Sequence, residues 1–76
     1  MRTLLVELEE REIHFLGAVI EGYDGLAMLS RDYEVIDGRT FFRLLVGPGF
    51  EEEVERLLEE LKEYAAIGEI RQALPG

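Results

Sequence analysis

The order of the hydrophobic patterns constrains the fold of this chain more than any single motif does. Apolar residues alternate in strand-like fashion over some segments and recur with the period of a helix over others. In chain order the expected elements are a strand, a helix, two strands, a helix and a strand, over residues 4–8, 13–23, 26–36, 40–46, 50–65 and 69–74. These elements use nearly the whole chain and leave no room for a linker or a repeat.

This β-α-β-β-α-β order is the split βαβ, or ferredoxin-like, arrangement. We therefore predict an α+β sandwich in which a four-stranded antiparallel sheet carries both helices on one face. Two right-handed crossovers then give the strand order 4-1-3-2 from edge to edge. The whole chain, residues 1–76, is expected to be one domain.

The helical segments supply most of the expected core. Segment 50–65 has a single apolar stripe, and segment 13–23 has an arc of roughly 200°, about twice what a surface helix needs. Gly17 lies within that arc, which predicts a close approach of the helix to the sheet. The residues expected to be mostly buried are Leu4, Val6, Ile20, Val46, Leu57, Leu58 and Leu61.

The central strands are joined by Asp37-Gly38, which is typical of a two-residue type I′ hairpin turn. That turn would place Tyr33 opposite Phe42 and Asp32 opposite Arg43, the latter a favourable cross-strand charge pair. The polar stretch 30–34 leaves a loop or bulge open as an alternative.

Composition limits the classes of partner. The net charge is −9, which disfavours nucleic acids and anionic membranes. The chain has no cysteine, which excludes disulfides and thiolate metal sites. No apolar run approaches the ~20 residues of a membrane span, and acidic residues from Glu7 onward argue against a signal peptide. A cytoplasmic, bacterial-type protein is expected, and the absence of asparagine fits heat-adapted composition.

The only histidine, His14, is the first candidate for chemistry. Glu10 lies four residues earlier, so the pair could offer two metal ligands, but two exposed ligands bind weakly. A solvated surface histidine is the favoured interpretation, with the glutamates of segment 51–63 forming a solvated helix face. We therefore expect no catalytic, cofactor or metal site. The alternative is a small metal-dependent enzyme that uses His14 and neighbouring carboxylates.

Surplus apolar side chains predict an interface instead. The sheet face opposite the helices would be open, and the helix at 13–23 has more apolar surface than its core contact requires. The candidate interface residues are Leu5, Met28, Phe41 and Leu45 on the open face, and Phe15, Val19 and Tyr23 on the helix. Self-association as a homodimer is the resulting hypothesis.

Two resemblances bear on this hypothesis. The stretch from Phe15 to Leu29, with its Gly-Tyr-Asp-Gly-Leu turn, and the later Gly-Pro-Gly entry into an acidic helix resemble a family of short uncharacterised bacterial proteins. At the level of fold the chain resembles ACT domains, which pair through sheets or helices and often bind amino acids between subunits. ACT domains commonly have an Asp-x-Pro-Gly-like turn after strand 1, and this chain has Glu9-Glu10-Arg11-Glu12 there.

The function expected from these observations is a non-catalytic module for small-ligand sensing or protein interaction. Such a module would act as a homo-oligomer, most simply a homodimer, and its ligand would be a small molecule such as an amino acid.

Overall fold

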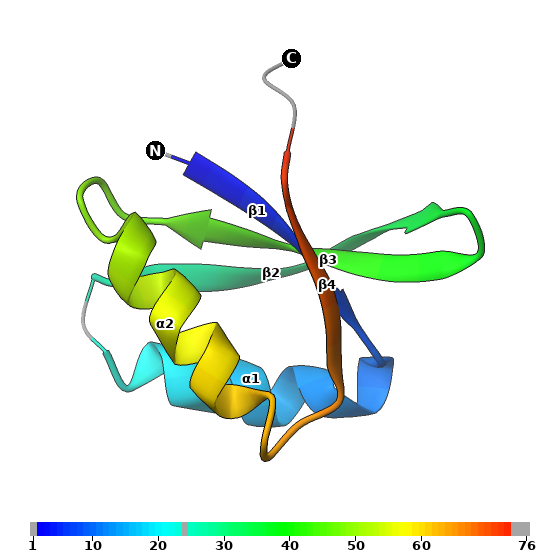
Figure 1. Cartoon of the computed structure of the whole chain (residues 1–76), viewed down its shortest axis with the longest axis horizontal. Helices are drawn as coiled ribbons and strands as arrows, with labels where there is room; N and C mark the ends of the chain where they lie inside the picture. Colours follow the sequence, from blue (N-terminus) through cyan, green and yellow to red (C-terminus); the bar gives the residue numbers. More distant parts are fainter. Residues whose placement is uncertain (1, 24, 74–76) are drawn as a thin grey trace.

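The computed structural model describes residues 2–23 and 25–73 and confirms the α+β, ferredoxin-like fold (Figure 1). Its elements are β1 (Arg2–Leu8), the short 3-10 helix η1 (Glu10–Glu12), α1 (Ile13–Glu21), β2 (Ala27–Ile36), β3 (Arg39–Val46), α2 (Glu51–Leu61) and β4 (Ile67–Gln72). The strand order is β2-β3-β1-β4 with antiparallel neighbours, which is the predicted order. Leu74, the expected end of the last strand, lies outside the described residues.

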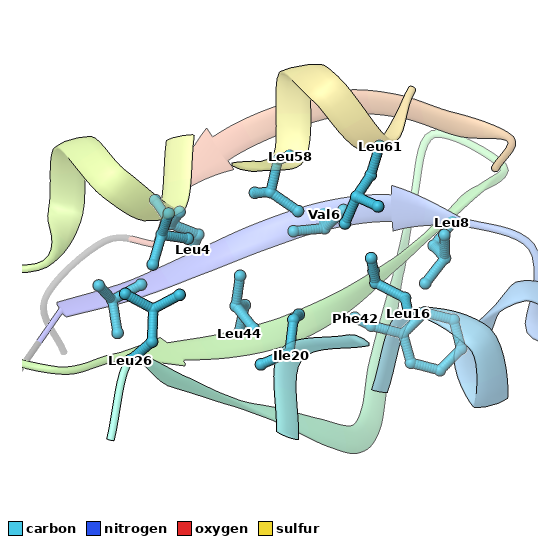
Figure 2. Close-up of a cluster of buried hydrophobic side chains, with 12 residues drawn as sticks. Leu4, Val6, Leu8, Leu16, Ile20, Leu26, Phe42, Leu44, Leu58 and Leu61 are labelled. Carbon is cyan, nitrogen blue, oxygen red and sulfur yellow. The ribbon is translucent and has the colours of Figure 1, made fainter. Parts of the chain in front are cut away.

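Both helices pack on the same face of the sheet and close a single core (Figure 2). Leu16 and Ile20 of α1 meet Leu58 and Leu61 of α2 over one face of the central strands. The strand residues of this core are Leu4, Val6, Leu8, Phe42, Leu44 and Val46. The predicted core is confirmed, with Leu57 only half-buried at its margin.

Gly17 has a different role from the predicted one. A methyl group at this position would have Leu29 Cδ2 as its nearest neighbour, at 3.9 Å, which is ordinary van der Waals contact. The helix therefore does not need a glycine here in order to reach the sheet. Gly47 is the tight position, because a Cβ there would lie 2.6 Å from the carbonyl oxygen of Gly25.

The β2–β3 hairpin has the predicted turn. Asp37 and Gly38 both have positive φ, 53° and 76°, as a type I′ turn requires, and Tyr33 pairs with Phe42. Further from the turn the register shifts, so that residues 30–32 together oppose the single residue Arg43. The Ser30 hydroxyl accepts a hydrogen bond from the Asp32 N–H at 3.1 Å and stabilises this bulge.

The bulge overturns one predicted ion pair. Arg43 binds the carboxylate of Glu34, and the hydrogen bond and charge of Glu34 raise the pKa of the Arg43 guanidinium. Asp32 lies in the bulge and not opposite Arg43 in a regular ladder. The bulge adds two residues to β2 relative to β3. Because side chains alternate between faces with a period of two, those on either side of the bulge stay on their predicted faces.

The helices are too short to cover the whole hairpin. The nine residues of α1 span about 14 Å, whereas the ten residues of β2 span about 33 Å. The turn end of the hairpin therefore projects past both helices (Figure 1). Tyr33 and Val35 lie on the core face of the sheet in this projecting part, yet each is 62% exposed.

Candidate functional site: the hairpin groove

The expected interface on the open sheet face is largely closed by the chain itself. Phe41 is 0% exposed and Leu5 is also buried, so neither offers free apolar surface to a partner. The guanidinium carbons of Arg39 and Arg71 lie 5.6 and 4.8 Å from the centroid of the Phe41 ring. Both guanidinium groups therefore lie against the ring in cation–π contact and help to shield it from water. The expected exposure of Phe41 was wrong for this reason, and that of Leu5 was wrong because its side chain is also buried.

Carboxylates hold these arginines in place. Arg39 Nη1 lies 3.3 Å from Glu7 Oε1 and 3.1 Å from Glu69 Oε1, and Arg71 Nη2 donates to Glu69 Oε1 at 3.2 Å. The hydrogen bond from Arg71 lowers the pKa of the Glu69 carboxyl and raises that of the Arg71 guanidinium. The result is a charge-balanced cap over Phe41.

The other candidate interface residues form two small patches. Met28, 60% exposed, pairs with the half-buried Leu45 on the open face. Phe15 of α1 and Tyr23, just beyond the end of α1, are exposed, whereas Val19 is half-buried against the core. The structure brings neither patch together with Phe41 as one continuous apolar surface.

His14 is exposed on α1, away from any cluster of ligands. Within residues 2–23 and 25–73, no three Asp, Glu or His side chains are grouped so that they could hold a metal ion. The described helices also include none that is long and apolar enough to cross a membrane.

A groove of about 800 Å³ lies beneath the projecting hairpin. Tyr33 and Val35 of β2 form one wall, and Phe42 of β3 lies at its base. The rings of Tyr33 and Phe42 are tilted by 51° with centroids 5.7 Å apart, so the wall is aromatic and preformed. Tyr33 and Val35 are the side chains that the helices fail to cover.

The opposite wall comes from the end of β1 and the start of β4. It contains Leu8 and the segment 66–68. The backbone N–H of Ala66 donates to Glu12 Oε2 at 3.0 Å, which fixes this segment against η1. Gly68 faces the Glu7 carboxylate so closely that a Cβ would lie 2.5 Å from its Oε1. The β1–β4 register shifts here, and the Glu7 carboxylate accepts the backbone N–H of Glu69 at 3.0 Å.

Acidic side chains surround the mouth of the groove. Glu7, Glu9 and Glu10 line it, and the basic residue of the lining is Arg39. Apolar walls with a few polar groups at the rim are typical of binding sites for small ligands or peptide side chains. The groove can therefore bind a small ligand or a peptide side chain. Its lining residues include no nucleophile paired with a general base.

Sequence reasoning missed this groove because it expected the free apolar surface on the opposite face of the sheet and on the helix at 13–23. The available signal was length, since strand segment 26–36 is far longer in space than the helix before it. A comparison of the two spans would have flagged an uncovered end of the hairpin.

The comparison with protein families gives one match. Residues 6–64 match the model described as Domain of unknown function (DUF4911). The chain belongs to the DUF4911 family. The matched region runs from within β1 to just beyond α2, so it includes Tyr33, Val35 and the hairpin, while β4 lies outside it. No curated protein and no solved structure matches the chain.

Proposed function

We propose that this DUF4911 chain is a non-catalytic binding module that acts as a homo-oligomer and accepts a small ligand or a segment of a partner protein in the hairpin groove. The observation that carries the proposal is the 62% exposure of both Tyr33 and Val35 on a face that is core elsewhere. Exposed apolar surface beside a concavity commonly marks an interaction site. The volume of the groove, about 800 Å³, also falls in the ~300–1,000 Å³ range of ligand-binding sites.

Self-association would use apolar surface outside the groove. A second copy could cover either of two patches: Met28 with Leu45 on the open face, or Phe15 of α1 with Tyr23 just beyond that helix. A cytoplasmic, bacterial, ACT-like module that binds an amino acid is the finer form of this proposal. Its support is the shared βαββαβ order, and fold alone does not determine function.

Two measurements test the proposal. Sedimentation equilibrium should show a homodimer at high micromolar concentration, and Met28→Glu or Phe15→Glu should reduce it according to which patch is used. A thermal-shift screen against amino acids, nucleotides and divalent metals should give a ligand-dependent rise in Tm, since a ligand that binds only the folded state stabilises it. Monomeric wild-type protein would refute the homo-oligomer.

Paired variants assign any ligand to the groove. Val35→Thr together with Tyr33→Ser should abolish the ligand-induced rise in Tm. Tyr64→Ser is the matched control, because Tyr64 is also exposed but lies outside the groove lining. Equal loss in both proteins would remove the groove from the proposal.

The metal-dependent enzyme that uses His14 stays a prediction that no observation in the structure favours. A divalent-metal shift in Tm that His14→Ala abolishes would support it.

A further inference from the structure

The charges around the hairpin groove are unequal. Arg39, the basic side chain of the lining, is already bound by Glu7 at 3.3 Å, and Glu9 is bound by Arg11 at 2.6 Å. Glu10 lines the mouth, is exposed, and has no ion pair with any residue in the described part of the chain. The groove therefore presents negative charge that residues 2–23 and 25–73 do not neutralise.

The aromatic wall suits the stem of a basic side chain. The exposed Tyr33 ring lies 5.7 Å, centroid to centroid, from the buried Phe42 ring. Lysine or arginine packs its methylenes on such an aromatic surface while its charged end reaches nearby carboxylates. The fold also places an arginine against an aromatic ring on the other face of the sheet, where the guanidinium carbon of Arg71 lies 4.8 Å from the centre of the Phe41 ring.

Several occupants fit this groove poorly. Phosphate groups, nucleic acids and acidic peptides would bring negative charge to Glu10 and its neighbours. A second copy of the chain is expected at the apolar patches outside the groove, which are Met28 with Leu45 or Phe15 with Tyr23. A basic partner would instead be drawn toward the molecule by the field of the whole chain.

Resting on the proposed binding function, we propose that the hairpin groove binds a basic segment of another protein, in which lysine or arginine alternates with aliphatic side chains. The aliphatic groups fill the space against Val35. The stems of the cationic groups pack on Tyr33, and their charged ends pair with Glu10 at the mouth. The partner chemistry follows from charge complementarity combined with the uncovered apolar wall.

Fluorescence anisotropy with labelled peptides tests this proposal. The probe is a decapeptide of alternating lysine and leucine. Two matched peptides replace either its lysines by glutamate or its leucines by serine. The lysine–leucine peptide should bind at least about tenfold more tightly than either, and its affinity should fall as salt rises, since exposed charges are screened beyond about 10 Å at 0.1 M.

Variants locate the site. Glu10→Gln should weaken the lysine–leucine peptide about two- to fivefold, the effect of one exposed charge pair. Glu55→Gln removes the same charge from an exposed position of α2 outside the groove lining and should change affinity less. Val35→Ser should weaken binding, and circular dichroism should show both groove variants folded.

Each result decides a separate question. Equal binding of the glutamate–leucine peptide would overturn the basic-partner inference and leave a groove that binds by its apolar walls alone. Equal effects of Glu10→Gln and Glu55→Gln would show attraction to the net charge and overturn the assignment to the groove. If no peptide binds while an amino acid raises Tm through Tyr33 and Val35, the basic partner is wrong and the proposed function stands.

Discussion

Arg71 lies over Phe41, with its guanidinium carbon 4.8 Å from the centre of the ring. Arg39 approaches the same ring at 5.6 Å, and Glu69 holds both arginines. An aromatic ring on the sheet face opposite the helices is thereby buried without a third layer. The cap removes Phe41 from the apolar surface of the open face, where Met28 stays exposed.

Phe41→Ala should lower the free energy of unfolding by about 3–5 kcal/mol, the usual cost of removing a buried aromatic ring. Urea denaturation followed by circular dichroism measures this loss. Met28→Ala on the same face is the control and should cost far less, because Met28 is 60% exposed. A loss below about 1 kcal/mol for Phe41→Ala would show that the ring is not buried in the isolated chain.

Leu58→Ala should lower the free energy of unfolding by about 2–5 kcal/mol, because Leu58 is fully buried in the core. Leu57→Ala removes the same atoms from a half-buried position at the core margin, so its cost should be smaller. Equilibrium denaturation of both variants checks the difference. Equal losses would mean that the apolar stripe of α2 is turned differently against the sheet.

Two glycine substitutions should change stability in opposite directions. Gly17→Ala should stabilise the protein by about 0.4–1 kcal/mol, since the helix has room for the methyl and the unfolded chain loses freedom. Gly47→Ala should destabilise it by more than about 1 kcal/mol, because the new Cβ would lie 2.6 Å from a backbone oxygen that cannot turn away. Thermal denaturation measures whether each substitution raises or lowers Tm. A higher Tm for Gly47→Ala would contradict the close approach of the Gly25 carbonyl oxygen to Gly47.

Acid should weaken the cap over Phe41. The hydrogen bond from Arg71 lowers the pKa of the Glu69 carboxyl from its ordinary value of 4.5, so the folded state binds this proton less readily than the unfolded state. The resulting stabilisation is complete above that ordinary value and is lost as pH falls through the lowered pKa. Between about pH 6 and about pH 3 the wild type should therefore lose more stability than Glu69→Gln.

Arg71→Met keeps an apolar stem near Phe41 but removes the hydrogen-bond donor. It should reduce the pH dependence in the same way as Glu69→Gln, and the two changes together should add little. Urea denaturation across the pH range measures these slopes. An unchanged slope in both variants would show that the pair does not link folding to protonation.

Much of the fold was predictable because it depends on local patterns. The period of apolar residues located the helices and strands, and Asp37-Gly38 located the hairpin turn and the pairing of Tyr33 with Phe42. The polar stretch 30–34 indicated a bulge as an alternative, and the structure has one. The Asp32–Arg43 pair failed because a register shift between strands depends on how the whole sheet closes.

The sequence by itself determined the element order, the strand order and the buried stripe that includes Leu58, because chain connectivity and hydrophobic period act along the chain. Only the tertiary structure decided which apolar residues remain exposed. Arg71 of β4 contacts Phe41 of β3, which is far away in the sequence. Helix α1 is too short to cover Tyr33 and Val35, so both stay exposed. Both outcomes depend on the relative lengths and positions of packed elements, which a one-dimensional pattern does not contain.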